Sequence, residues 1–245
     1  MRVGDEKDRD EADTVGATTL RAEHVEIVGD AEIKFDFLGK DSVRWIQRIR
    51  PPPAVVQNIR ECMGTRGKAL LFKGVKSEKV NEFLGRVMPG LTAKVFRTYH
   101  ASKAVTEYLG CAKVKRNDDT LVKKAAATMA NLQAAIVCNH KRKLPKNWRE
   151  SMAKKKQRLK ELRVKGRKKQ AKALAIRIRL MKETRDHNLG TSLRSYIDPR
   201  IYAKWGRRVD FDWKNYYPKT LQRKFTWVDN QRTSTPTGET PTSQS

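Results

Sequence analysis

The sequence lacks a long apolar run. No stretch of about 18 apolar residues, the minimum for a membrane-spanning helix, occurs in the chain, and the longest candidate, at 125–138, is interrupted by Asn131 and Gln133. The N-terminus, MRVGDEKDRDEAD, is acidic where a secretory signal would place basic and then apolar residues. We therefore expect no membrane insertion and no secretory leader.

Cysteine is scarce as well. The three cysteines, Cys62, Cys111 and Cys138, are widely spaced, odd in number and form no CxxC pair. This pattern argues against a disulfide framework and against a zinc site, and it is typical of reduced intracellular thiols. We expect neither a metal nor another cofactor.

Acidic residues are outnumbered two to one. The 245-residue chain has 54 Lys and Arg against 27 Asp and Glu, a net charge of +27 and a pI near 10.3. Residues 1–36 carry a net charge of −6, so the basic character belongs to the rest of the chain. Such a charge predicts a polyanionic partner, and nucleic acid, an acidic membrane surface and packing within a ribosome all fit.

Hydrophobic periodicity divides the chain into a small β region and a larger helical one. Segment 17–37 alternates apolar and polar residues on both sides of Gly29-Asp30, which indicates a hairpin. From 43 to 138 the pattern becomes helical, with a break at the three prolines 51–53. We predict an α+β fold, mainly α, with a small N-terminal β-sheet.

Residues 148–188 are strongly basic, with 16 Lys and Arg against 4 Asp and Glu. If the segment folds back at Gly166, its apolar residues face one another in pairs, with Leu162 opposite Ala171. The pattern predicts an antiparallel helical hairpin with a thin apolar seam and a basic exterior.

The stretch TSLRSYIDPR, residues 191–200, places Tyr196 between Arg194 and Arg200. The plain interpretation is a half-buried aromatic side chain beside a helix. The chemical interpretation is a nucleophile that attacks a phosphate. Such a site needs fixed donors for the non-bridging oxygens, which arginine provides, and a proton source for the leaving oxygen, which lysine provides. Composition cannot choose among 54 basic residues.

Six strings in the chain carry a family resemblance. They are RVGDEK at 2–7, ADTVG at 12–16, FDFLGKDSVRW at 35–45, LTAKVFRTYHAS at 91–102, CNHKRKLPK at 138–146, and Ser-x-x-x-Tyr-x-Asp-Pro-Arg at 192–200. In this order they resemble the C-terminal half of eukaryotic-type DNA topoisomerase I, the type IB family, over about residues 1–230. The resemblance implies a DNA breaking-rejoining catalytic core of the tyrosine recombinase-like type.

The same strings contain a counterpart for every member of the family's catalytic pentad. By this resemblance, Arg2 is the first arginine, in RVGDEK, and Lys40 is the lysine of the Gly-Lys-Asp-Ser turn. Arg97, in VFRTY, is the second arginine, and His140, in CNH, is the histidine. Tyr196 is the nucleophile.

The resemblance also implies the reaction. Tyr196 would attack one strand of double-stranded DNA and remain as a 3′-phosphotyrosine, while the two arginines and the histidine hold the phosphoryl oxygens and the lysine protonates the leaving 5′ hydroxyl. One phosphodiester is exchanged for another, so supercoils relax without ATP or a metal. The sequence agrees, because it has no GxxxxGK[ST] phosphate loop. Asp41 and Ser195 are implied contacts of DNA or of camptothecin-type drugs.

The family likeness suggests how the chain is organised. We expect a catalytic core subdomain at 1–146, the basic hairpin as a linker at 147–188, a C-terminal subdomain with the nucleophile at 189–230, and a disordered tail at 231–245. The expected location is the nucleus.

The chain departs from the family pattern in several places. Leu193, Arg194 and Ser195 stand where the family has Lys-Leu-Asn, His100 replaces an Asn, and the hairpin is shorter than in the family. The family's N-terminal cap region has no counterpart before Arg2. We therefore expect the chain alone to be incomplete, as a truncated gene product, an incomplete gene model, or one subunit of a split enzyme that works with a separate cap-containing chain.

Two other classes of protein stay open. A non-enzymatic basic nucleic-acid-binding protein would explain the charge and the hairpin, but it would leave the ordered motifs unexplained and would form no covalent adduct. A tyrosine recombinase would share the nucleophile and the pentad, but it would need sequence-specific contacts and an ordered assembly of several subunits.

Overall fold

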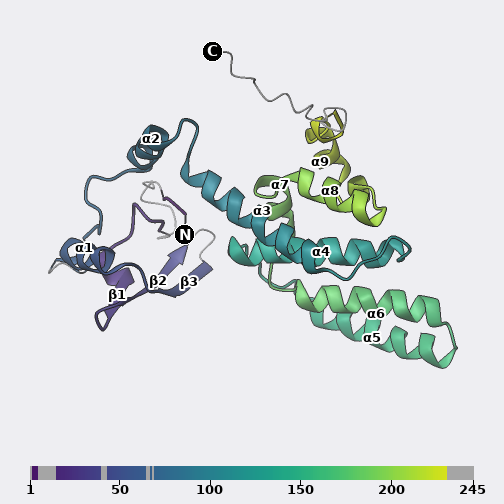
Figure 1. Cartoon of the computed structure of the whole chain (residues 1–245). Coiled ribbons are helices and arrows are strands. Elements are labelled where there is room, and N and C mark those ends of the chain that lie inside the picture. Colours follow the sequence, from purple (N-terminus) through teal and green to yellow (C-terminus); the bar gives the residue numbers. More distant parts are fainter. Residues whose placement is uncertain (1, 5–14, 40–42, 65–66, 68, 231–245) are drawn as a thin grey trace, which may run out of the picture. The chain divides into compact units, whose positions relative to one another are not determined.

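The computed structural model describes residues 2–4, 15–39, 43–64, 67 and 69–230. The chain forms two compact units, Met1–Phe96 and Arg97–Ser245 (Figure 1). Each unit has a hydrophobic core of its own. The tail predicted at 231–245 lies outside the described residues, and the division at 146, 188 and 230 stays a prediction.

The N-terminal unit contains a three-stranded antiparallel sheet in the order β1-β2-β3. β1 (Val25–Val28) and β2 (Glu32–Gly39) form the predicted hairpin, and Gly29 in its turn has a φ of +62°, which glycine adopts at little cost. β3 (Val43–Ile49) pairs with β2 from Gly39↔Val43 to Ile33↔Ile49. The prediction of a helical pattern from residue 43 is therefore wrong for this segment, because VRWIQRI is rich in β-branched and aromatic residues and completes the sheet.

One face of the sheet forms the core of this unit. Ile33, Phe35 and Phe37 alternate along β2 and are buried, as the two-residue period of a strand requires. They pack with Val56 and Ile59 of α1 (Pro53–Met63), which begins directly after two prolines. The apolar period thus decides which face of the sheet the helix covers.

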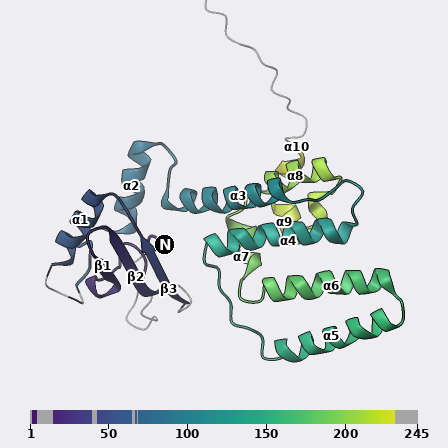
Figure 2. The same cartoon turned by 60° about the horizontal axis from the view of Figure 1, so that its bottom comes forward.

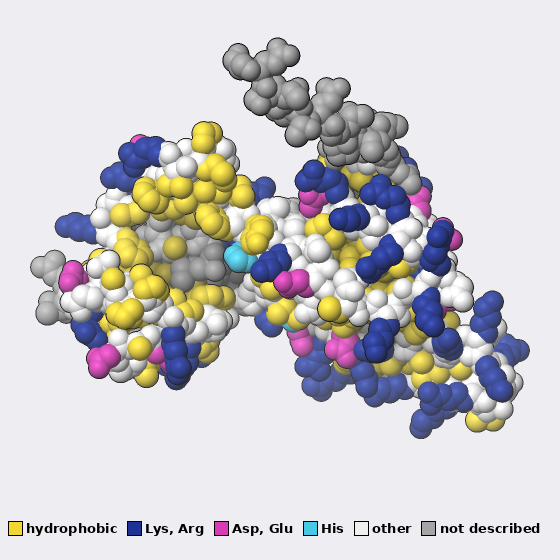
Figure 3. All heavy atoms as spheres, in the orientation of Figure 1, with side chains coloured by type: hydrophobic (Ala, Val, Ile, Leu, Met, Phe, Trp, Pro, Cys, Tyr) yellow, Lys and Arg dark blue, Asp and Glu magenta, His cyan; other side chains and the backbone are white. Residues whose placement is uncertain are grey.

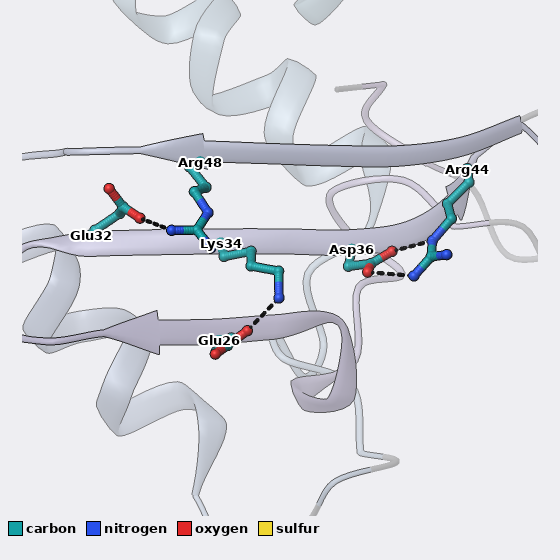
Figure 4. Close-up of polar contacts among 6 residues, drawn as sticks. All are labelled: Glu26, Glu32, Lys34, Asp36, Arg44 and Arg48. Carbon is teal, nitrogen blue, oxygen red and sulfur yellow. Dashed lines mark hydrogen bonds and ion pairs between the residues drawn. The ribbon is translucent and has the colours of Figure 1, made fainter.

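Ion pairs cross the strands on the opposite face (Figure 4). The three pairs are Glu26–Lys34 (2.7 Å), Asp36–Arg44 (2.7 Å) and Glu32–Arg48 (3.0 Å). The hydrogen bond from the Lys34 ammonium lowers the pKa of the Glu26 carboxyl, and the hydrogen bond from the Arg44 guanidinium lowers the pKa of the Asp36 carboxyl. These pairs are solvent-exposed, so each contributes little to stability.

Two further helical elements belong to the N-terminal unit. A 3-10 turn, η1 (Ala22–His24), precedes β1, and α2 (Ser77–Val87) follows α1. The long helix α3 (Ala93–Cys111) then carries the chain across the boundary between the units.

The C-terminal unit is helical, and α3 and α4 (Thr120–Val137) supply much of its core. The buried residues of α3 are Ala101, Val105 and Leu109, four residues apart, which places them on one face of the helix. α4 begins at Asp119, whose carboxylate accepts a hydrogen bond from the backbone N–H of Leu121, a typical N-cap.

Short helices complete this core. They are α7 (Leu189–Ser195), α8 (Pro199–Val209), η3 (Trp213–Asn215), α9 (Lys219–Lys224) and α10 (Trp227–Asn230). Their aromatic side chains pack together in the interior, with ring centroids 5.1 Å apart for Trp213–Tyr217 and 5.7 Å apart for Trp205–Phe211. The aromatic cluster fixes the C-terminal segment against α3 and α4.

The predicted basic hairpin is present as α5 (Trp148–Val164) and α6 (Lys168–Glu183), which lie side by side in both ribbon views (Figures 1 and 2). The chain reverses at Gly166, which has a φ of +62°. Its buried seam consists of Met152, Leu162, Ala171 and Ile178. Many Lys and Arg side chains project from the face of this region that Figure 3 shows.

Three further features are the state of the cysteines, the grouping of possible metal ligands and the apolarity of the helices. All three cysteines are free, with Cys138 buried and the other two exposed. Within the described part of the chain, no group of three His, Cys, Asp or Glu residues could hold a metal ion. Among the helices of that same part, none is long and apolar enough to cross a membrane.

Candidate active site

Tyr196 lies at the junction of α7 and α8. It is the C-cap of α7, and its backbone N–H donates to the carbonyl of Ser192. Two residues later Asp198 caps α8 by accepting from the N–H of Arg200, and Pro199 occupies the first helical position. A residue before proline is biased away from the helical conformation, so the sequence Tyr-x-Asp-Pro ends one helix and starts the next.

A hydroxyl from α3 holds this junction in place. Ser102 Oγ accepts a hydrogen bond from the N–H of Asp198 at 3.1 Å and donates to the carbonyl of Tyr196 at 3.4 Å. The main chain on both sides of Ile197 is therefore tied to α3. This contact limits the movement of the tyrosine backbone.

Arg97 approaches the same tyrosine from five residues earlier on α3. Its Cζ lies 5.1 Å from the centroid of the Tyr196 ring, and its Nη2 donates to the carbonyl of Cys138 at 2.8 Å. Arg97 Nε is buried and has no hydrogen-bond partner within the described part of the chain. Because most buried donors in proteins are paired, this guanidinium has capacity for an anionic ligand.

His140 is the third member of the group. It follows α4 by way of Asn139, which has a φ of +51°, a left-handed conformation that often ends a helix. The His140 side chain is buried, and its Nδ1 is 2.9 Å from Ser192 Oγ. Its ring centroid lies 5.2 Å from that of Tyr196. The structure therefore brings together a cation, an imidazole and a phenol from three separate elements.

Three of the other tyrosines are core residues. Tyr202, Tyr216 and Tyr217 pack among the aromatic side chains of the C-terminal unit. Burial raises the pKa of all three phenols, to about 12 for Tyr216. These buried phenols are therefore harder to deprotonate than an ordinary tyrosine.

Comparison with known proteins identifies the family of this chain. A model described as the catalytic core of eukaryotic DNA topoisomerase I matches residues 1–174, and one described as a C-terminal topoisomerase domain matches residues 168–234. The chain belongs to the eukaryotic DNA topoisomerase I family.

Topoisomerases from several organisms are similar to this chain over most of its length. The protein named DNA topoisomerase 1 from Caenorhabditis elegans is 33% identical over 268 residues, which cover 93% of this chain and 33% of that protein. DNA topoisomerase 1 from Drosophila melanogaster is 36% identical over 255 residues, covering 93% of this chain and 26% of that protein. The mitochondrial DNA topoisomerase I of Rattus norvegicus is 33% identical over 273 residues, covering 94% and 46%. The chain thus spans between about a quarter and about half of the length of these relatives.

Of the five residues predicted as the catalytic pentad, the structure groups three in one unit: Arg97, His140 and Tyr196. Arg2 belongs to the N-terminal unit, where its carbonyl accepts a hydrogen bond from the N–H of Ala17 at 2.8 Å. Lys40 lies outside the described residues.

Of the two residues predicted to contact DNA or a drug, the structure describes one. Ser195, directly before Tyr196, is exposed at the end of α7. Asp41 follows Lys40 and lies outside the described residues as well.

Ser102 and Ser192 were not predicted as site residues. Both lie inside the strings that resemble topoisomerases, LTAKVFRTYHAS and Ser-x-x-x-Tyr, so the strings contained them without indicating a role. Ser192 precedes Tyr196 by four residues, a helical spacing, which was the available signal.

The base of the basic hairpin is fastened beside the site. The N–H of Asn188 donates to the carbonyl of His140 at 2.7 Å. Arg142 Nε and Nη2 donate to the carbonyls of Arg185 and Thr184, at 2.9 Å and 3.2 Å. The two strands of chain that enter and leave the hairpin are therefore bonded to each other. We call this set of bonds between 140–142 and 184–188 the hairpin base.

Proposed function

We propose that this chain provides the DNA cleavage and rejoining centre of a type IB topoisomerase. The observation that carries the proposal is the cluster of Arg97, His140 and Tyr196, in which a guanidinium and an imidazole both lie against one partly exposed phenol. The family membership of the chain gives the reaction, and the cluster has the groups that the reaction requires.

In the proposed reaction, Tyr196 releases its phenolic proton to solvent, and its Oη attacks a phosphorus of one DNA strand. A bond from phosphorus to the tyrosine oxygen forms, and the bond from phosphorus to the 5′ oxygen breaks, which leaves a 3′-phosphotyrosine. Lys40 gives a proton to the leaving 5′ oxygen, and Arg97, His140 and Arg2 donate hydrogen bonds to the non-bridging oxygens. The reverse attack by the 5′ hydroxyl reseals the strand, so no ATP is consumed.

The proposed partner is double-stranded DNA. The exposed Lys and Arg of α5 and α6 would contact phosphates without reading sequence, because phosphate contacts position a protein on DNA but do not specify bases. The proposal includes a tyrosine recombinase-like catalytic core, the predicted division into core, linker and C-terminal subdomains, and a nuclear location. One of the similar relatives is named as mitochondrial, so microscopy of a fluorescent fusion tests the location.

The proposal also includes a cap-containing polypeptide. In the family, as the resemblance implies, a cap closes over DNA from the side opposite the catalytic residues. This cap is supplied either on the same polypeptide in a longer protein or by a separate chain. Plasmid relaxation by the chain with and without a cap-containing fragment tests whether a cap is required.

Trapping on a suicide DNA substrate tests the central proposal. A suicide substrate loses the 5′ end after cleavage, so the covalent adduct accumulates. Tyr196→Phe removes one oxygen and no charge, and it should abolish the adduct while leaving DNA binding unchanged within about twofold. Tyr99→Phe is the matched control, because Tyr99 is an exposed tyrosine on α3. An undiminished adduct in Tyr196→Phe would refute the assignment of the nucleophile.

The same assay addresses the two alternatives. A basic nucleic-acid-binding protein without catalysis would form no adduct in any variant. A recombinase would form adducts only at a defined DNA sequence, whereas the proposed topoisomerase forms them at many positions in a mixed-sequence duplex.

A further inference from the structure

We infer that Ser192 is a positioning residue that fixes the orientation and the proton of the His140 ring for the cleavage reaction. This inference deepens the proposed function and rests on it. It starts from the short, buried contact between Ser192 Oγ and His140 Nδ1, 2.9 Å apart.

The two cap residues of α7 and one residue inside the helix contact His140. Asn188, Ser192 and Tyr196 follow one another at the spacing that places side chains on one side of a helix. His140 contacts all three: its carbonyl accepts from the N–H of Asn188, its Nδ1 meets Ser192, and its ring lies 5.2 Å from the ring of Tyr196. The helix that ends at the nucleophile therefore also holds the histidine.

The position of Ser192 leaves its hydroxyl little freedom. Ser192 is fully buried, with an exposed fraction of 0%, and α7 packs against α4, the helix after which His140 lies. The amide of Asn131 on α4 adds a bond to the carbonyl of Leu189, at 3.2 Å, in the first turn of α7. A hydroxyl held in this way makes the same bond in every molecule, and it fixes the rotation of the imidazole ring.

A hydroxyl suits this task because it can donate and accept. When the imidazole is neutral, a hydrogen bond donated by Ser192 to Nδ1 keeps the ring proton on Nε2, since the partner of one ring nitrogen sets the protonation of the other. When the imidazole is charged, Nδ1 donates and the same hydroxyl accepts. In both states Nε2 carries a proton, and a phosphoryl oxygen requires such a donor.

Nitrogen NMR measures this effect without catalysis. The chain has four histidines, so long-range ¹H–¹⁵N spectra of the labelled 245-residue protein contain four ring systems, and His140→Gln identifies one of them. At alkaline pH, where imidazole is neutral, we expect the His140 ring to be in the Nε2-protonated form. Ser192→Ala should convert it to a mixture of tautomers, and Ser192→Thr, which keeps the hydroxyl, should restore the single form. A ring that is unaffected by Ser192→Ala would overturn the inference.

A double-mutant cycle measures the effect on cleavage. The assay is the single-turnover rate of adduct formation on the suicide substrate, with the chain alone or with the cap-containing fragment, whichever arrangement relaxes plasmid. Ser192→Ala should slow cleavage about ten- to a hundredfold, the usual effect of removing a partner that orients a functional histidine. In a His140→Ala background the same change should have no further effect, because the histidine through which Ser192 acts is absent. Equal losses in both backgrounds would show a structural role for Ser192 and overturn the inference.

The outcomes separate this inference from the proposed function. If neither Tyr196→Phe nor His140→Ala reduces adduct formation, the proposed function fails, and the NMR result still decides the role of Ser192 toward the ring. If both reduce it and the Ser192 losses are additive, only the inference fails. If thermal unfolding shows that Ser192→Ala does not fold, Ser192→Cys replaces it, because a thiol keeps the shape of the side chain and is a weak hydrogen-bond donor.

Discussion

Replacement of Arg97 by alanine removes a cation that lies against the Tyr196 ring. The guanidinium carbon lies 5.1 Å from the centre of the Tyr196 ring. At an effective dielectric constant of about 20, a unit charge about 5 Å from a developing negative charge stabilises it by about 3 kcal/mol, which corresponds to about two orders of magnitude in rate. The loss of a fixed donor to a phosphoryl oxygen has a similar size, about 10²–10³ in rate. We therefore expect Arg97→Ala to slow adduct formation at least a hundredfold.

The same substitution should lower stability by a smaller amount. The Cys138 carbonyl loses the donor Nη2, and a hydrogen bond from a charged donor contributes about 1.5–3 kcal/mol, less here because Arg97 is partly exposed. Arg97→Lys should recover part of the binding of DNA but little of the rate, because the ammonium of lysine lacks the planar, fixed fork of donors that the guanidinium presents.

The assay is single-turnover cleavage of a suicide duplex, followed by separation of the covalent adduct, with thermal unfolding of each variant as a check on folding. Lys103→Ala is the control, since Lys103 is an exposed cation on the same helix, six residues from Arg97. A rate for Arg97→Ala within a few-fold of the unmodified chain would refute the argument. An equal loss in Lys103→Ala would show that total charge, and not the position of the guanidinium, is responsible.

Four further predictions concern other parts of the chain. Lys40→Ala should slow cleavage about 10²–10³-fold on an ordinary substrate, and a leaving group that needs no proton, a 5′-phosphorothiolate, should restore the rate if Lys40 is the acid. Ser195→Asn should increase camptothecin-stabilised cleavage, because a longer amide reaches further than serine, and unchanged trapping would exclude this contact as the determinant. DNA binding by the chain alone should weaken steeply with salt, by a slope of about −0.9 in log K for each phosphate contacted. An affinity that does not change with salt, together with processive relaxation, would refute the idea that the chain contacts DNA from one side only. The folded-state pKa values of Glu26 and Asp36 are lowered, so the stability that these carboxylates contribute is present above the usual carboxyl pKa and is lost as the pH falls through the lowered values. Asp36→Asn should therefore make the melting temperature less sensitive to acid below about pH 4.

The sequence predicted the parts of the fold that depend on local patterns. The hairpin at Gly29 and the reversal at Gly166 were predicted because turns that need a positive φ leave a glycine in the sequence. The third strand was not predicted, because the β-branched and aromatic residues of VRWIQRI are interrupted by polar ones, and the segment completes the sheet by pairing with β2. Non-local pairing of this kind leaves no periodic signal in one short segment.

The residues of the candidate site were likewise predicted only in part. Arg97, His140 and Tyr196 were predicted by resemblance, and the structure brings them into contact although 99 residues separate the first from the last. Ser102 and Ser192 were missed because a serine is common in helices and only its partner gives it a role. The roles of Arg2 and Lys40 stay predictions.

The hairpin base has a consequence for the tolerance of the chain to change. A segment of 41 residues, from 143 to 183, lies between His140 and Tyr196 in the sequence. The hydrogen bonds between 140–142 and 184–188 join the two ends of this segment. The turn at Gly166, where a Cβ would meet nothing within 4 Å, can therefore change without altering the spacing of the histidine and the tyrosine. A backbone break near Gly166 should therefore yield two polypeptides that reassemble into one site, and the hairpin is the position at which the chain can best accept an inserted domain or a fused label.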